Sequence, residues 1–201
     1  MLDFTYEEKA FSEGYTTVCG IDEAGRGPLM GPVCAAAVIL PDHFVIEGLD
    51  DSKKLTEKKR EALFPVITGA AEAYSIAYAT AEEIDELNIL NATMLAMQRA
   101  IDGLRIKPDL ALIDGNCKRN IRIPAVTIVG GDAKCPSVAA ASVLAKVSRD
   151  RLCYEMDREY PQYGFAKHKG YGTKDHMKAL FEYGPCPYHR KTFLKFLNDE
   201  K

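Results

Sequence analysis

The sequence of 201 residues lacks a long apolar run, a paired cysteine motif and a basic leader. Its longest unbroken apolar stretch, residues 33–40, is too short to cross a bilayer, and the opening MLDFTYEEKAF is acidic where a secretory leader would be basic. The six cysteines are scattered without a CxxC pair, which argues against a zinc site or a disulfide framework. We therefore expect a cytoplasmic protein with reduced thiols and no membrane segment.

The sequence also lacks internal repeats, low-complexity segments and any linker that would divide it. Hydrophobic residues make up 47% of the chain and charged residues 27%, which excludes a disordered or fibrous protein. We expect one domain over residues 1–201, in which residues 160–201 form a basic loop and a helical C-terminal part. No large apolar surface is indicated, so a monomer is expected.

A strong net charge is absent, and the formal value of −3 taken alone argues against a nucleic-acid partner. The charge is nevertheless unevenly distributed. Residues 1–100 hold 8 Lys and Arg against 17 Asp and Glu, whereas residues 101–201 hold 18 against 12. Residues 161–191 alone hold 6 against 2, together with three histidines. The C-terminal half is therefore a candidate surface for a polyanion.

The order of apolar patterns predicts an α/β fold. Strands are expected at residues 15–21, 33–40, 71–80, 110–113 and 125–129, the last two as apolar runs buried on both faces. Helices are expected from residue 57 to a kink or end at Pro65, over 80–104 as one broken helix or two, and at 138–160, 174–183 and 191–197. This order favours a mixed sheet flanked by helices, with a small C-terminal helical extension.

Acidic residues follow three of the predicted strands directly. They are Asp22 with Glu23, Asp114, and Asp132 after two glycines. A single acid after a strand is usually a turn former, but three such coincidences suggest a shared site at the strand ends. Clustered carboxylates repel one another unless a cation lies among them, and oxygen-only ligands select Mg²⁺ or Mn²⁺. Two such ions would support metal-dependent phosphodiester cleavage.

Five stretches carry a resemblance to a known family, in order along nearly the whole chain. They are GIDEAGRGPLMGPV from Gly20, DSKKLTEKKR from Asp51, LIDGN from Leu112, GGDAKCPSVAAASVLAKVSRDR from Gly130 and YGFAKHKGYGT from Tyr163. Together they resemble ribonuclease HII, the bacterial type 2 ribonuclease H. The resemblance implies a ribonuclease H-like fold that cleaves the RNA strand of RNA/DNA hybrids. It also implies nicking 5′ to single ribonucleotides embedded in duplex DNA, leaving a 5′-phosphate and a 3′-hydroxyl.

The resemblance also implies roles for individual residues. The four acids Asp22, Glu23, Asp114 and Asp132 match the catalytic and metal-binding acids of the family, with Asp132 either binding a second metal or orienting the attacking water. The substrate-binding residues implied by the family motifs are Gly25, Arg26 and Gly27, which would read the ribose 2′-hydroxyl, and Tyr171, which would stack on the sugar. Without those motifs, the glycine pair would be read as a tight turn and Tyr171 as a loop anchor.

Basic residues are weaker candidates, because a charged side chain is usually only solvated. Candidates for contacts with the nucleic-acid backbone are Lys53, Lys54, Lys146, Lys167, Lys169, Lys174 and His168, of which Lys53, Lys146 and Lys169 are selected as substrate-binding residues. A histidine could assist proton transfer to the leaving oxygen, but none is assigned a catalytic role.

Three alternatives stay open. Ribonuclease HIII resembles this family but has a lysine in the middle of the glycine motif and an additional N-terminal domain, so Arg26 and the short segment before Asp22 disfavour it. A non-catalytic nucleic-acid-binding module would gain nothing from four repelling carboxylates. A metal-dependent phosphatase for small substrates would leave the basic C-terminal part and the glycine motif unexplained.

Overall fold

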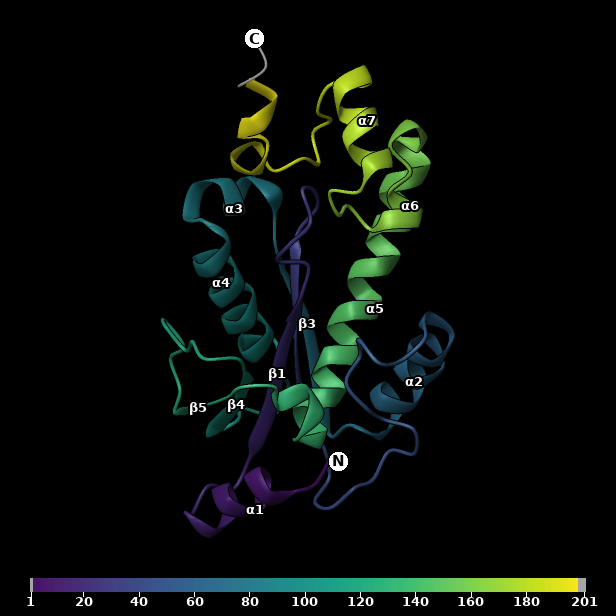
Figure 1. Ribbon diagram of the computed structural model, residues 1–201. Coiled ribbons are helices and arrows are strands. Elements are labelled where there is room, and N and C mark those ends of the chain that lie inside the picture. The colour runs from purple at the N-terminus through teal and green to yellow at the C-terminus, as the bar shows by residue number, and fades with distance from the viewer. Residues whose placement is uncertain (1, 199–201) are drawn as a thin grey trace.

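A single sheet of five strands runs through the computed structural model, which describes residues 2–198 (Figure 1). The strands are β1 (Val18–Ala24), β2 (Val33–Ile39), β3 (Ala73–Ala79), β4 (Leu110–Asp114) and β5 (Ala125–Ile128), in the spatial order β3-β2-β1-β4-β5. The pairs β1–β2 and β2–β3 are antiparallel, whereas β1–β4 and β4–β5 are parallel. The expected mixed sheet is therefore confirmed.

Helices cover both faces of this sheet. They are α1 (Thr5–Ser12), α2 (Glu57–Ala70), α3 (Ala81–Leu87), α4 (Ile89–Asp102), α5 (Pro136–Glu159), α6 (Phe165–His168) and α7 (Lys174–Tyr183). Figure 1 shows α3 and α4 on one side of the sheet and α5 with α2 on the other, while α6 and α7 gather beyond the end of α5. The expected C-terminal helical extension is confirmed.

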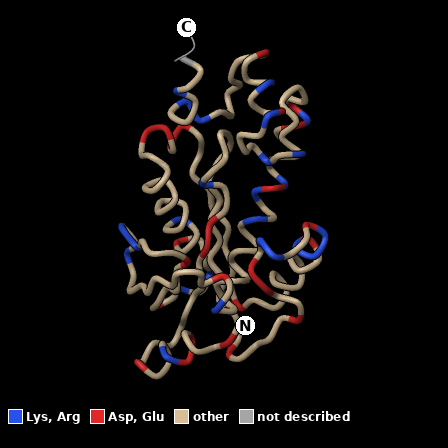
Figure 2. Tube along the Cα trace, in the orientation of Figure 1, with Lys and Arg blue, Asp and Glu red and all other residues tan. Residues whose placement is uncertain are grey.

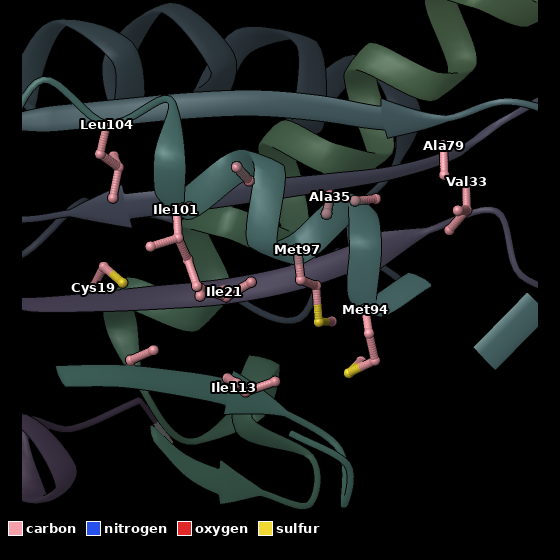
Figure 3. Packing of buried hydrophobic residues seen from close by; sticks show 14 of the residues in the cluster. Cys19, Ile21, Val33, Ala35, Ala79, Met94, Met97, Ile101, Leu104 and Ile113 are labelled. Atoms are coloured by element: carbon pink, nitrogen blue, oxygen red, sulfur yellow. The ribbon is translucent and has the colours of Figure 1, made fainter. Parts of the chain in front are cut away.

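Side-chain alternation along β2 explains this arrangement. Odd-numbered residues such as Val33 and Ala35 pack with α4, and even-numbered residues such as Cys34 and Ala36 pack with α5. Figure 3 shows Met94, Met97 and Ile101 of α4 directed toward the strands, among the side chains of Cys19, Ile21 and Ile113. Both faces of the central strands are therefore buried.

The small residues at the start of α5 bring it very close to β1. A Cβ atom added to Gly20 would lie 2.1 Å from the backbone carbon of Ser137, a distance that no side chain could accept. The alanine-rich first half of α5 therefore packs directly on β1, the strand that carries Asp22.

Two expectations about individual elements are wrong. The α2 helix continues through Pro65 to Ala70, because Pro65 lies on its exposed face, where water can solvate the carbonyl that loses its helical hydrogen bond. Strand β5 is not buried on both faces, because it is an edge strand of the sheet and Val126 is 41% exposed.

The structure also settles the number and type of helices over residues 80–104 and 191–198. The helical stretch over 80–104 is two helices, separated at Asn88, whose φ is +68°, and Thr80 and Glu83 form a capping box at the start of the first. Residues 191–197 do not form one helix but two short 3-10 turns, Lys191–Phe193 and Lys195–Asn198. Helices α1 and α6 were not expected from the sequence. No helix within residues 2–198 is both long and apolar enough to span a membrane.

Candidate active site

Parallel pairing of the central strands places the acids of the sequence motifs side by side. Strand β1 does not end at Ile21 as expected but continues to Ala24, so Asp22 lies within it. Because β1 and β4 are paired in register up to Ile21 and Ile113, Asp22 lies beside Asp114, the last residue of β4, at the carboxyl edge of the sheet where β4 ends. Asp132 follows β5 after a turn and lies in a 3-10 turn, Gly131–Ala133. The Gly131 amide donates a hydrogen bond of 2.7 Å to Asp114 Oδ1, which holds that turn against β4.

Three carboxylates converge at this edge. One oxygen each from Asp22, Asp114 and Asp132 lies within 4.8 Å of the others, and Asp22 and Asp132 are buried. Glu23 does not belong to this triad, but it lines the same cavity of about 210 Å³ as Asp22 and Asp114. The structure therefore brings the four predicted acids to one location, with three of them close enough to share a cation.

The electrostatics of the triad favour a bound cation. Burial raises the pKa of Asp22, and the carboxylates of Glu23 and Asp114 raise it further. Burial also raises the pKa of Asp114, with the Asp132 carboxylate adding to it. Burial also raises the pKa of Glu23, and the nearby Arg26 guanidinium offsets part of this rise. A divalent ion among these oxygens would remove the repulsion that raises these values.

Lys53 provides a positive charge at the triad. Its Nζ lies 2.9 Å from Asp132 Oδ2, and this hydrogen bond raises the pKa of the lysine. The neighbouring Ser52 hydroxyl lies 2.7 Å from the Ser142 hydroxyl of α5, which ties the DSKK loop to the helix. Lys53 is therefore placed at the acids, although its side chain is 75% exposed.

The glycine motif and Tyr171 form the opposite wall of the same cavity. Gly25, Arg26 and Gly27 line it directly after β1, and Tyr171 reaches it from the loop between α6 and α7. The Tyr171 ring is next to Gly27, where an added Cβ would be 3.4 Å from ring atom Cε1, and Tyr171 is 48% exposed. The structure thus brings the predicted sugar-contacting residues within one cavity of the acids.

The basic candidates separate into two groups. Lys146 lines the cavity, and its Nζ lies 2.7 Å from Asp150 Oδ1. Lys169 does not line it: its Nζ donates to the Ala166 carbonyl at 2.7 Å and lies over the Tyr154 ring. The other candidates also lie away from the cavity wall, with Lys54 paired to Asp50, Lys167 paired to Asp175, Lys174 at the start of α7, and His168 buried.

Sequence reasoning missed three residues that line the cavity: Ser52, Ser142 and Arg149. Ser142, Lys146 and Arg149 are spaced by four and three residues along α5, so they lie on one face of that helix. That helical spacing was the signal that could have identified Ser142 and Arg149, whereas Ser52 lies in the DSKK loop.

Comparison with known proteins identifies the family. A family model described as Ribonuclease HII matches residues 19–197. The chain belongs to the ribonuclease HII family. It is 60% identical over 176 residues to Ribonuclease HII of a Polaromonas species, with 88% of each chain covered. It is 53% identical to Ribonuclease HII of Caldicellulosiruptor saccharolyticus, with 96% of this chain and 94% of the relative covered.

Solved structures agree with this assignment. The crystal structure of ribonuclease H2 from Pyrococcus horikoshii OT3 is similar with a TM-score of 0.76 at 28% identity, covering 92% of this chain and 98% of that one. The fold is thus ribonuclease H-like, and as a ribonuclease HII family member the chain is a nuclease with ribonuclease H activity. Its acidic triad is a site that could bind a metal ion.

Proposed function

We propose that this ribonuclease HII family member cleaves the RNA strand of RNA/DNA hybrids and nicks duplex DNA on the 5′ side of a single embedded ribonucleotide. One observation supports this most strongly. The acidic triad and the Gly25–Arg26–Gly27 backbone line or adjoin one cavity, so a phosphate and the ribose beside it could occupy the site together. The hydrolysis would leave a 5′-phosphate and a 3′-hydroxyl.

The triad suits Mg²⁺ or Mn²⁺ because its donors are all carboxylate oxygens and include no histidine or cysteine. Asp22, Asp114 and Asp132 would hold the metal, with Glu23 available for a second ion. When bound, such ions neutralise the phosphate and stabilise the charge that develops during in-line displacement.

The chain's own residues would then orient the substrate. Among the described residues, the amides of Arg26 and Gly27 have no hydrogen-bond acceptor, so they are free to donate to a ribose oxygen at the cavity wall. A 2′-hydroxyl both accepts and donates, which a deoxyribose cannot do. The Tyr171 ring would pack against the sugar, and Lys53 and Lys146 would contact phosphate oxygens.

A nicking assay tests this proposal. The purified protein is incubated with Mg²⁺ or Mn²⁺ and a DNA duplex that contains one ribonucleotide, next to an all-DNA duplex of the same sequence. We expect a single cut at the 5′ side of the ribonucleotide and no cut in the all-DNA duplex. Absence of cleavage with either metal, or equal cleavage of both duplexes, would contradict the proposal.

Ribonuclease HIII-like activity is the nearest alternative, and the presence of Arg26 in the glycine motif disfavours it. A long RNA/DNA hybrid separates the two in the same assay. Efficient cleavage of the hybrid with no cut at a single ribonucleotide would favour the alternative.

A further inference from the structure

Two arginines are buried behind the glycine motif without a carboxylate partner. Arg149 is 1% exposed and Arg190 is 0% exposed, and neither forms an ion pair within residues 2–198. A buried guanidinium is costly unless hydrogen bonds satisfy its N–H groups. The groups that accept from these two arginines therefore show which segments they hold in place.

Arg190 donates its hydrogen bonds to backbone carbonyls of one short loop. Its Nη2 lies 2.6 Å from the Gly25 oxygen, and its Nη1 lies 3.0 Å from the Arg26 oxygen. Nη1 also donates to the Pro28 oxygen at 2.7 Å, and Nε donates to the Gly31 oxygen at 2.9 Å. One side chain from the C-terminal part thus holds four carbonyls of the 25–31 loop.

Backbone pairing adds to this attachment. The Arg190 amide donates to the Leu29 oxygen at 2.9 Å, and the Gly31 amide donates to the Tyr188 oxygen at 2.8 Å. Met30 and His189 form an isolated antiparallel bridge. The 25–31 loop is therefore attached to a segment that lies about 160 residues later in the chain.

The direction of the peptide groups links Arg190 to the cavity. In a trans peptide the carbonyl of one residue and the amide of the next point in opposite directions. Because the Gly25 and Arg26 carbonyls point at Arg190, the amides of Arg26 and Gly27 point away from it. Neither of these two amides has an acceptor in the described part of the chain.

Arg149 connects this loop to the loop that carries Tyr171. Its Nη2 donates to the Met30 oxygen at 3.2 Å, and its Nη1 donates to the Lys169 oxygen at 3.0 Å. Its side chain also lies directly on Gly25, where an added Cβ would be 2.0 Å from Arg149 Nε. The two guanidinium groups thus fix the two walls of the sugar-binding region relative to each other.

We infer that Arg190, supported by Arg149, is a positioning residue that sets the direction of the Arg26 and Gly27 amides and thereby the selectivity for a 2′-hydroxyl. This inference rests on the proposed function. Arg190 does not touch the substrate, because it is fully buried behind the loop and four of its five N–H groups donate to loop carbonyls. Burial and the neighbouring Arg149 charge lower the pKa of Arg190 to about 9, so it is still cationic at neutral pH.

The test compares Arg190→Lys with the wild-type protein. A lysine keeps the charge, but one ammonium group cannot reach all four carbonyls. For the duplex with one ribonucleotide we expect kcat/KM to fall at least tenfold. The all-DNA duplex, used as a competitive inhibitor, reports contacts that do not involve the 2′-hydroxyl, and we expect its Ki to change less than twofold. The matched control is Arg105→Lys, because Arg105 also binds a backbone carbonyl, that of Glu72, but outside the site.

The outcomes separate the inference from the proposed function. If the wild-type protein does not cut the ribonucleotide duplex, the proposed function fails on its own. If the wild-type protein cuts it and Arg190→Lys keeps the same kcat/KM, or if kcat/KM and the affinity for DNA fall together, the inference is overturned. If Arg190→Lys shows no cooperative thermal unfolding, Arg149→Lys replaces it, and the same selective loss is expected.

Discussion

At the scale of single residues, the site holds buried carboxylates that repel one another when no cation is bound. Burial raises the pKa of both Asp22 and Asp114, and a neighbouring carboxylate adds to each rise: Asp114 acts on Asp22, and Asp132 acts on Asp114. Lys53 offsets only part of this, by its hydrogen bond to Asp132 and its charge near Asp114. This arrangement costs stability in the metal-free protein, and the cost is recovered when a cation binds. The site is therefore built for its bound state.

Replacement of either acid by its amide tests this reading. We expect Asp22→Asn and Asp114→Asn to lower turnover by at least about 100-fold, because each removes one ligand charge. In the absence of divalent cations at pH 8 we expect their melting temperatures to rise, because the repulsion is removed. Both quantities are measured by the nicking assay and by calorimetry.

The control is Asp42→Asn. The Asp42 side chain is 70% exposed and lies away from the cavity. This substitution should change neither turnover nor melting temperature. A near-normal rate in Asp22→Asn or Asp114→Asn would remove that residue from the site.

Tyr171 is expected to matter most where a single ribose must be recognised. Tyr171→Ala removes the ring beside Gly27, and loss of such packing typically costs about 1–3 kcal/mol, or roughly 5- to 160-fold in rate. On a long hybrid, many ribose positions offer alternative binding registers, so a smaller loss is expected. Rates on both substrates provide the measurement, with Tyr74→Ala, an exposed tyrosine on β3, as control. Equal losses on both substrates would show that the ring is structural.

At the scale of elements, the break between α3 and α4 depends on one residue. Asn88 has a φ of +68°, and its Oδ1 accepts hydrogen bonds from the amides of Leu90 and Asn91 at 3.1 Å. Asn88→Ala removes this cap and places alanine at a positive φ, which alanine adopts less readily than asparagine, so we expect the free energy of unfolding to fall by about 1–2 kcal/mol. Asn88→Gly also removes the cap, but glycine adopts a positive φ without strain, so the free energy of unfolding should fall less than in Asn88→Ala. Urea denaturation distinguishes them, and an equal loss would contradict this account.

Strands and helices with a clear period were predictable from the sequence. The alternation in β3 and the spacing in α7 each reflect one face buried against the core, which is a local pattern. The exposure of β5 was not predictable in this way. Its apolar run resembles a central strand, and only the spatial order of the sheet shows that it lies at the edge.

The candidate site was predictable only in part, for a related reason. Asp22 and Asp114 are visible in the sequence because each comes directly after an apolar strand run, and parallel neighbours bring the ends of such runs together. Arg190 gives no such signal, since it binds backbone carbonyls, which leave no pattern of side chains in the sequence, and these carbonyls lie about 160 residues away. Side chains that act on the backbone of distant loops require the structure.

At the scale of the whole molecule, the uneven charge follows the architecture. Figure 2, in the orientation of Figure 1, shows Lys and Arg along α5, in the C-terminal part and between β4 and β5. The net charge of −3 therefore conceals segments rich in Lys and Arg that lie near the acidic site. Binding of a nucleic acid through exposed side chains of these segments should weaken with added salt.

The C-terminal part also links the stability of the molecule to pH through two buried histidines. His176 Nδ1 lies 3.0 Å from the Tyr171 carbonyl, which only accepts, so this nitrogen carries the proton. His176 Nε2 must then accept from His189 Nε2 at 3.0 Å, and His189 Nδ1 accepts from the Cys186 amide. Every ring nitrogen is satisfied when both imidazoles are neutral.

Acid should therefore destabilise the protein through these rings. Burial lowers the pKa of His176 and of His189 to about 4, below the usual value of 6.5. Between these values the unfolded chain binds more protons than the native protein. The contribution of the two neutral rings to the free energy of unfolding should thus be complete above pH 6.5. It should decrease toward pH 4, by up to about 1.4 kcal/mol per pH unit for each ring.

The acids of the site have the opposite effect on stability. Because the pKa values of Asp22 and Glu23 are raised in the native state, the native protein binds protons before the unfolded chain does, which increases the free energy of unfolding as the pH falls. The wild-type curve alone is therefore insufficient, and the comparison with His189→Gln isolates the histidines. Glutamine can donate and accept in place of the ring but does not titrate. Melting temperatures from pH 7.5 to 4.5 should fall less steeply in His189→Gln than in wild type. His43→Gln, at a side chain that is 57% exposed, should follow wild type. An acid slope in His189→Gln equal to that of wild type would show that the paired rings do not govern the acid stability of the fold.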